Sequence, residues 1–593
     1  MKVYKDLWWF FKKEKTGYLF GILMLVLVAL MELIPPQVIG RVIDSISADT
    51  LTPRNLTVFL AVLVVAAILT YIFRYFWRVL IFGASNRLGK IMRERLFRKY
   101  AKMSPSFYQE MRTGDLMAHA TNDIRAVQMT AGAGILAIAD SLITGGAVLI
   151  TMAVTISPKL TLIAMIPLPL MAVLTSYYGK LLNRGFKKAQ AAFSALNDKT
   201  QESIAGIKVT KTFGYEKSDQ DDFKTLSDDV VQKNLKVSKI DALFDPTIML
   251  VIGASYFLSV FFGARMVYAD EITIGQLVTF TTYLGMMVWP LLALGWFFNL
   301  VQRGSASYER INKIMNTKND IKQDNYIQAL PKGEIEFNID RFNFPKDESD
   351  GIRDVNFKIS EGATVGIVGR TGSGKSALIR LLLREFDTEH ADDILYGGIP
   401  IRDYNIKTLR DRFGYVPQEH FLFSTTIRKN IAFSNPELDD SVIFEASTLS
   451  DIHKDILNFH DGYDTVVGER GVSLSGGQKQ RISIARALIM EPEVLILDDS
   501  LSAVDAETEE KILNNMQKAR KGRTNIITAH RMSAVKNADL IIVMDNGTVI
   551  ERGTHDELMQ VKGWYYDTYN AQALRDSLTH ELDDMVEGDD RDE

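Results

Sequence analysis

The chain has 593 residues, of which 47% are apolar and 24% are charged, and it carries a net charge of -5 and no cysteine. This length is too great for one domain. The small negative charge gives no sign of nucleic-acid binding, and the lack of cysteine excludes disulfides and Cys-ligated metals. Long uncharged runs fill the first half, whereas the second half has the composition of a soluble α/β domain.

The first 16 residues place four consecutive aromatic side chains, from Trp8 to Phe11, among lysines. This pattern is typical of an amphipathic helix lying in the membrane interface. We therefore predict an interfacial helix over residues 1–16 on the cytoplasmic face. A soluble tail is the alternative, but it would not need four aromatics in succession.

Six later stretches are long enough to cross a hydrocarbon core of ~30 Å, which takes about 20 apolar residues. Basic residues crowd the segment after the second stretch, between Arg87 and Lys102. Because basic loops remain cytoplasmic, both termini and the two long connections should face the cytoplasm. We also expect the protein to lie in the cell membrane. The predicted spans are 18–38, 56–76, 131–156, 160–178, 246–264 and 274–301.

Two long connections, residues 82–130 and 179–243, contain few helix breakers. About 30 helical residues would reach ~45 Å beyond a span. Turn-rich pieces at 112–115 and 213–216 would form the tips, which we expect to touch a soluble domain. The alternative is two soluble hairpins. This predicts a membrane domain over 17–315 with two cytoplasmic coupling loops, followed by a linker over 316–333.

Ionisable side chains occur inside the predicted spans, where charge often marks a substrate pathway. Asp140 lies mid-span, so a basic partner such as Arg74 or a water-filled cavity must offset its charge. The alternatives are that Arg74 and Arg78 lie near a membrane interface, or that an acid and a base simply pair within the bundle. The sixth span adds Met and aromatic side chains, which suit an adaptable cavity but also ordinary packing. The candidate substrate contacts are Glu32, Asp140, Trp289 and Trp296.

A glycine-rich loop follows the apolar strand 364–368 and opens a helix at Ala377. In a phosphate-binding loop the backbone N–H groups wrap the phosphates, and the helix N-terminus adds positive potential. Lys375 should reach the β- and γ-phosphates, and Ser376 should ligate Mg²⁺. The pattern predicts an α/β phosphate-loop domain that binds ATP. The residues expected to bind the nucleotide there are Gly369, Arg370, Thr371, Gly372, Ser373, Gly374, Lys375, Ser376 and Ala377.

The strand 494–498 ends in Asp498, a carboxylate placed to hold Mg²⁺, and is followed by Asp499. Nucleotide-hydrolysing sites need a Glu at this second position to polarise the attacking water. A base must lie within ~2.6–3.2 Å of that water, and misplacement by about 1 Å can cost ~100-fold in rate. Because Asp499 is one methylene shorter, the sequence predicts a site that binds ATP well and hydrolyses it poorly.

Residues 474–478, Leu-Ser-Gly-Gly-Gln, resemble the signature motif of ATP-binding-cassette proteins. Six spans followed by one such cassette resemble a half-transporter of the exporter class. Segments 114–116, 285–290 and 498–500 are similar to those of the degenerate-site subunit of heterodimeric bacterial multidrug exporters. The resemblance covers nearly the whole chain. It implies a cassette over 334–575, after which the acidic tail 576–593 should be disordered.

The resemblance also implies roles at matching positions. Phe344 would stack on adenine, with a core aromatic as the alternative; Gln418 would sense Mg²⁺, and His530 would contact the γ-phosphate. In this family each ATP lies between one chain's phosphate loop and the other chain's signature motif. Glu469 and Arg470 would meet the partner's coupling helix. The residues expected at the partner's ATP are Ser475, Gly476, Gly477, Gln478 and Asp505.

Together, Asp499 and the intact signature motif imply a heterodimer with a second half-transporter that carries Glu at the base position. A slowly hydrolysing homodimer is the alternative. The expected function is ATP- and Mg²⁺-dependent export of amphipathic drugs or similar small molecules by alternating access. A lipid or lipid-precursor translocase and a gated, non-pumping membrane protein remain alternatives. No nucleic-acid partner is expected.

Overall fold

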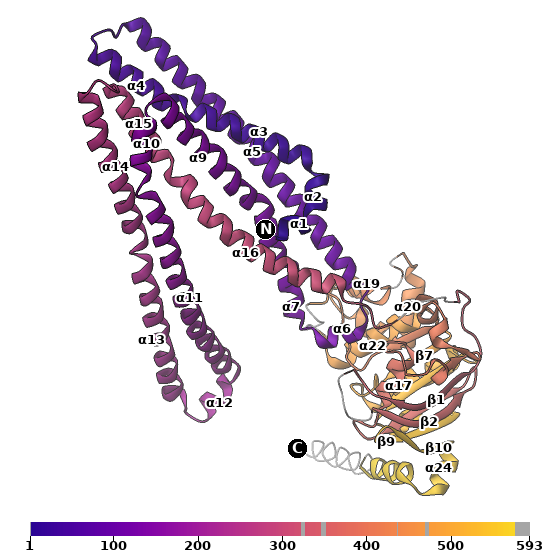
Figure 1. Cartoon of the computed structure of the whole chain (residues 1–593). Helices are drawn as coiled ribbons and strands as arrows, with labels where there is room; N and C mark the ends of the chain where they lie inside the picture. The colour runs from indigo at the N-terminus through magenta and orange to yellow at the C-terminus, as the bar shows by residue number, and fades with distance from the viewer. Residues whose placement is uncertain are drawn as a thin grey trace. The chain divides into compact units, whose positions relative to one another are not determined.

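The computed structural model describes residues 2–321, 327–345, 351–433, 435, 437–468 and 474–575. They divide into two compact units, Met1–Ala101 with Thr113–Thr317 and Lys102–Arg112 with Lys318–Glu593. The first unit is helical, and the second contains two β-sheets with helices around them (Figure 1). The predicted fold class, a helical membrane domain followed by an α/β phosphate-loop domain, is confirmed. The predicted acidic tail, Glu469 and Arg470 lie outside the described residues.

The helices of the first unit account for nearly all its residues. They are α1 (Lys2–Asp6), α2 (Trp8–Lys13), α3 (Lys15–Glu32), α4 (Ile34–Ser47), α5 (Pro53–Tyr100), α7 (Thr113–Ala118), α8 (Ile124–Met129), α9 (Ile135–Thr155), α10 (Pro158–Met165), α11 (Leu168–Ala205), α12 (Ile207–Thr212), α13 (Glu216–Asp241), α14 (Phe244–Tyr268), α15 (Ile274–Met286) and α16 (Val288–Asn316), with π-helical turns at His119–Asp123 and Thr130–Gly134.

Among the described residues, five helical stretches are long and apolar enough to cross a membrane. A sixth apolar helical stretch among the described residues, Pro158–Met171, is shorter and overlaps the predicted span 160–178. The chain is interrupted there at Pro167, between α10 and α11, since proline lacks the N–H that continues a helix. The five stretches are Lys15–Ser47, Pro53–Tyr100, Thr113–Thr155, Glu216–Tyr268 and Ile274–Asn316.

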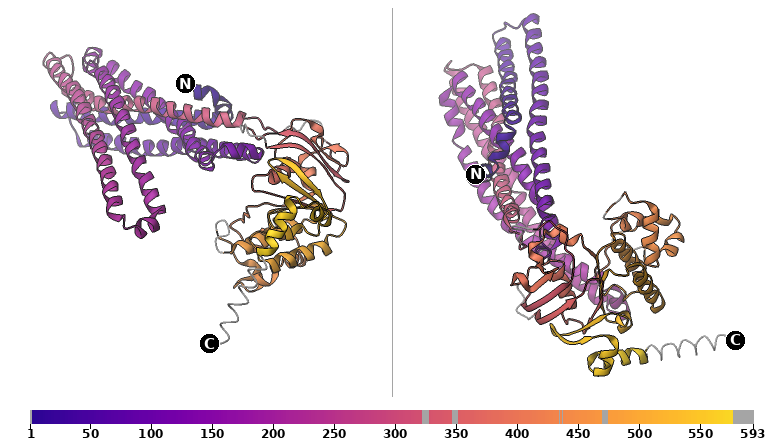
Figure 2. Two further views of the ribbon diagram at one scale, coloured as in Figure 1. Left: turned by 90° about the horizontal axis from the view of Figure 1, so that it is seen from below. Right: turned by 90° about the vertical axis from the view of Figure 1, so that its right-hand side faces the viewer.

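Helices α11 and α13 pack side by side and extend beyond the other helices of their unit, with α12 at the tip (Figures 1 and 2). The turn predicted at 213–216 separates α12 from α13. The turn predicted at 112–115 is wrong in part, because α7 begins at Thr113. The N-terminal segment forms α1 and α2, whose Phe10 is buried while Trp8 is 65% exposed. That residues 1–16 lie in the membrane interface stays a prediction.

The second unit contains a six-stranded sheet of order β10-β9-β3-β8-β7-β6 and a four-stranded sheet of order β2-β1-β4-β5. Strands β9, β3, β8, β7 and β6 run parallel, and β10 is antiparallel at the edge. The strands are β1 (Ile335–Phe342), β2 (Ile352–Ile359), β3 (Thr364–Gly369), β4 (Ile394–Tyr396), β5 (Ile399–Pro400), β6 (Phe413–Val416), β7 (Val494–Asp498), β8 (Thr524–Ala529), β9 (Leu540–Asp545) and β10 (Thr548–Gly553).

Carboxyl ends of parallel strands meet at one edge of a sheet. The phosphate loop follows β3, Asp498 ends β7, and His530 follows β8, so one edge gathers most of the predicted nucleotide residues. The helices of this unit are α6 (Pro105–Glu110), α17 (Lys375–Leu382), α18 (Ile406–Arg410), α19 (Ile427–Ile431), α20 (Asp440–Leu449), α21 (His453–Leu457), α22 (Gly476–Leu488), α23 (Ala506–Ala519) and α24 (His555–Val561). Residues 564–575 form a further helix, named here the C-terminal helix.

Candidate nucleotide site and membrane cavity

The phosphate loop is curled tightly between β3 and α17. Gly369 has φ +151°, and a Cβ there would lie 2.1 Å from the Met544 carbonyl oxygen, so only glycine fits. The Lys375 ammonium donates to the carbonyls of Gly369 at 2.9 Å and Arg370 at 3.0 Å. The Ser373 hydroxyl is buried without a hydrogen-bond partner among the described residues. A loop with an inward amine and an unsatisfied hydroxyl fits a polyphosphate.

Asp498 is held by side chains from three elements. Its Oδ1 accepts from Ser376 at 3.0 Å and from Thr528 at 2.7 Å, and its Oδ2 accepts from Tyr415 at 3.4 Å. A carboxylate beside a hydroxyl is the hard-oxygen set that Mg²⁺ prefers, so Ser376 and Asp498 fit the predicted ion. Sequence reasoning missed Thr528 and Tyr415, although Thr528 stands near the end of the neighbouring strand.

Asp499 has an unusual backbone, with φ +46°. Its N–H donates to the Thr528 carbonyl at 3.1 Å and hydroxyl at 2.9 Å, which fixes the main chain. Gln418 Nε2 lies 3.3 Å from the Asp499 carboxylate, so the structure brings these two predicted residues together. Burial raises the pKa of Asp499, while His530 and Lys375 oppose that shift. Asp499 and His530 line one small cavity.

Phe344 is partly buried and packs edge-on against Phe342 and Phe386, each with ring centroids 5.2 Å away. These contacts are those of a core aromatic, which was the alternative interpretation. Stacking of Phe344 on adenine stays a prediction.

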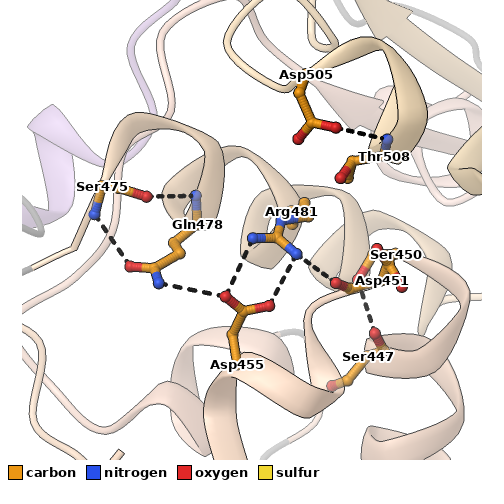
Figure 3. A network of polar contacts seen from close by, with 9 residues as sticks. All are labelled: Ser447, Ser450, Asp451, Asp455, Ser475, Gln478, Arg481, Asp505 and Thr508. Carbon is orange, nitrogen blue, oxygen red and sulfur yellow. Dashed lines mark hydrogen bonds and ion pairs between the residues drawn. The ribbon is translucent and has the colours of Figure 1, made fainter. Parts of the chain in front are cut away.

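The signature motif begins α22 with a reciprocal cap (Figure 3). Gln478 N–H donates to the Ser475 hydroxyl at 3.2 Å, and Ser475 N–H donates to the Gln478 side chain at 3.1 Å. Arg481 donates to Asp455 at 2.9 Å, and the Gln478 amide contacts the same carboxylate at 3.4 Å. Asp455 of α21 thus holds the first turns of α22 in place through Gln478 and Arg481. The sequence prediction did not include Asp455 or Arg481.

The loop 502–505 is attached to this same helix. Ala503 N–H donates to the Gln480 side chain at 3.0 Å, and a Cβ on Gly477 would lie 3.1 Å from the Ala503 carbonyl oxygen. Asp505 caps α23 by accepting from Thr508 N–H at 2.9 Å (Figure 3), and this bond holds the pKa of Asp505 low. The signature motif and loop 502–505 are therefore held together within one chain.

The membrane unit contains a cavity of about 560 Å³, and all four predicted substrate contacts line it. Glu32 forms an ion pair with Arg74, so Arg74 is not the partner of Asp140. The Asp140 carboxylate instead accepts from the Thr144 hydroxyl at 2.8 Å on its own helix. Further lining residues are Leu25, Val28, Trp77, Arg78, Leu136, Ala137, Thr144, Met286, Pro290 and Ala293. Substrate contact by these residues stays a prediction.

Comparison with known proteins agrees with both units. The family described as the ABC transporter transmembrane region matches residues 18–291, and the family described as ABC transporter matches residues 352–502. The chain is 44% identical to the probable multidrug resistance ABC transporter ATP-binding/permease protein YheI of Bacillus subtilis (strain 168), over 96% of this chain and 98% of that protein. The chain belongs to the ABC transporter family. Its membrane and ATPase regions are fused in one polypeptide.

Two further comparisons concern nearly the whole length of this chain. It is 44% identical to the multidrug resistance-like ATP-binding protein MdlA of Escherichia coli (strain K12), over 98% of each chain. A solved bacterial Atm1-family ABC exporter with ATP bound has a TM-score of 0.78 over 95% of this chain and 98% of that one. At 24% identity this second likeness shows the fold alone. The family's ATPase domain binds nucleotide with Mg²⁺ and couples its hydrolysis to export.

Proposed function

We propose that this chain is one half of a heterodimeric exporter of amphipathic small molecules, and that its own ATP site is impaired in hydrolysis. The observation that carries the proposal is Asp499, which stands at the base position beside Gln418. Asp498, Ser376 and Lys375 retain the side chains and contacts that nucleotide binding needs. ATP hydrolysis at this site would therefore be weakened by one residue, Asp499, while the residues for nucleotide binding are retained.

The competent ATP site would combine this chain's signature motif with the phosphate loop and Glu of a second half-transporter. Ser475 and the N–H groups at Gly476 and Gly477 begin α22, where a helix N-terminus favours anions. The reciprocal cap and the Asp455–Arg481 pair support this end. At this chain's own site, Lys375 would hold the phosphates, Ser376 and Asp498 would hold Mg²⁺, and Asp499 would accept the proton of water inefficiently.

In the membrane unit, Asp140 and the Trp residues of the cavity would bind the substrate, with a cationic amphipathic compound as the class that best suits an acidic group beside aromatic faces. The names of two 44%-identical relatives refer to multidrug resistance.

We further propose a plasma-membrane location with cytoplasmic termini. The proposed domains are an interfacial segment over 1–16, a membrane domain over 17–315, a linker over 316–333 and a cassette over 334–575.

Lipid translocation is the second candidate. The ATP-dependent lipid A-core flippase of Syntrophus aciditrophicus (strain SB) is 32% identical over 87% of this chain and 86% of that protein. Stimulation of ATPase activity by lipid rather than by drugs, in vesicles containing the assembled transporter, would favour this function.

The decisive experiment measures Mg²⁺-ATP binding and turnover by the full chain alone in lipid nanodiscs. We expect binding that Lys375→Ala weakens by at least about tenfold, since that side chain is the loop's only inward ammonium among the described residues. Turnover should stay far below a typical 1–10³ s⁻¹. Turnover in that range by the chain alone would refute the impaired site and favour the homodimer.

A further inference from the structure

The main chain on either side of His530 is held by one side chain from the C-terminal helix. Gln572 Nε2 donates to the His530 carbonyl at 2.8 Å, and Met532 N–H donates to Gln572 Oε1 at 2.9 Å. One carboxamide thus satisfies an acceptor and a donor two residues apart, and both bonds cross about 40 residues of sequence. Loss of this side chain would leave both backbone groups unsatisfied.

The position of this contact matters because of what lies before and after His530. The preceding strand, β8, is entirely buried and fixed in the sheet. The following turn, Met532–Val535, is a short 3₁₀ helix, whose first N–H groups have no partner within the helix. His530 therefore stands between a rigid strand and a turn that needs an external partner, and Gln572 supplies that partner.

The other side of the same turn is held independently. Arg531 donates to Glu509 at 2.9 Å, and the Ser533 hydroxyl donates to the same carboxylate at 3.3 Å. Glu509 is only 3% exposed. These contacts direct Arg531 toward α23 and leave the backbone of residues 530 and 532 to Gln572.

The C-terminal helix is itself firmly attached at its start. Tyr565 is fully buried and belongs to the same hydrophobic cluster as Ile527, Ala529 and Met532, and its hydroxyl lies 2.9 Å from His555 Nδ1. Tyr565 N–H donates to Glu551 at 3.2 Å. Gln572 follows Tyr565 by two helical turns and so returns to the same face. The packing at Tyr565 therefore fixes where along residues 530–532 the Gln572 carboxamide lies.

We propose that Gln572 is a positioning residue for His530, through which the C-terminal helix sets the response of this site to the γ-phosphate. The inference rests on the role proposed above for His530. Because the hydrogen bonds of the Gln572 side chain within the described residues go to the backbone of residues 530 and 532, its effect should be confined to ligands that His530 can contact. Binding of a nucleoside diphosphate should be insensitive to it.

The test uses the full chain in nanodiscs with Mg²⁺ and compares a non-hydrolysable ATP analogue, adenylyl imidodiphosphate, with ADP. Gln572→Ala removes two hydrogen bonds, so affinity for the analogue should fall roughly tenfold while ADP affinity stays unchanged. Gln572→Glu keeps the acceptor for Met532 N–H but not the donor to His530, so it should lose roughly threefold. Asn570→Ala, which removes an exposed carboxamide from the same helix, is the matched control and should change neither affinity.

A double-mutant cycle separates positioning from general destabilisation. In a His530→Ala background, Gln572→Ala should have no further effect on binding of the analogue. An equal loss with and without His530, an equal loss for ADP and the analogue, or no loss at all would overturn the inference. Rapid ATP turnover by the unchanged chain would refute the impaired site while leaving this comparison of two non-hydrolysed ligands intact.

Discussion

Two carboxylates show how differently the two units hold charge. Asp498 is 3% exposed and accepts from hydroxyls of β6, β8 and α17. Asp140 lines an open cavity and accepts from Thr144, one turn later on its own helix. A carboxylate fixed from three sides suits one ion in one geometry. A carboxylate whose hydrogen bond, within the described residues, comes from its own helix can follow ligands of different shape, which an exporter of varied compounds needs.

The largest expected effect tests the rigid carboxylate site of the ATPase unit, at Asp499 next to Asp498. Asp499→Glu restores the missing methylene and should raise ATP turnover at this site by roughly 10- to 100-fold in the assembled transporter, provided the partner's signature motif is sound. Part of the gain should be offset, because Glu tolerates the φ of +46° less well than Asp. Single-turnover hydrolysis, with the partner's phosphate-loop Lys replaced, measures this site alone. An unchanged rate would show that Asp499 does not limit hydrolysis.

A second, smaller effect concerns the signature motif. Gly477→Val adds a Cβ that would lie 3.1 Å from the Ala503 carbonyl oxygen and 3.5 Å from Val504 Cγ1. Loop 502–505 must shift, and the bulk also obstructs an approaching phosphate. Transport by the assembled exporter should fall by about tenfold or more, whereas ATP binding at this chain's own phosphate loop should persist. Transport left untouched would mean that this signature motif does not complete the partner's site.

The residues that the sequence could predict are those fixed by local chemistry. The phosphate loop and Asp498 stand directly at strand ends, where flanking apolar residues identify them. Tyr415 and Gln572 were missed because they reach the site across 83 and 42 residues of chain. Those contacts depend on the order of parallel strands and on where the C-terminal helix packs, and neither has a local signature in the sequence.

The membrane unit shows the same limit in another form. Charges inside the spans were evident, and Glu32 and Asp140 do line one cavity. Their partners were not evident: Arg74 was one of two candidates to offset Asp140, beside a water-filled cavity, and it pairs with Glu32 instead. Which base reaches which acid depends on how α3, α5 and α9 pack, since the candidate residues lie tens of positions apart. The break at Pro167 in the predicted fourth span is different, because the proline itself is a local signal that the sequence prediction did not use.

The smallest effect tests the loosely held carboxylate itself. Asp140→Asn keeps the size of the side chain and the hydrogen bond from Thr144 but removes the charge. A charge at the centre of a span costs about 2.5–3.5 kcal/mol on insertion scales, so the Asn variant should insert at least as well as the unchanged chain. We expect transport of a cationic dye to fall by roughly threefold, an effect of less than 1 kcal/mol, because water entering a cavity of about 560 Å³ would screen the charge.

Neutral substrates and ATP binding provide the control for Asp140→Asn, because neither depends on that charge. Dye efflux from vesicles should therefore decline selectively. Thr144→Val is a matched variant that removes the hydroxyl bonded to Asp140 without removing the charge. If Asp140 binds the cation directly, Thr144→Val should shift selectivity among cations rather than abolish transport, since it frees the carboxylate. Equal loss for charged and neutral substrates would assign Asp140 to helix packing, and the contrast with Asp498 would then no longer describe substrate binding.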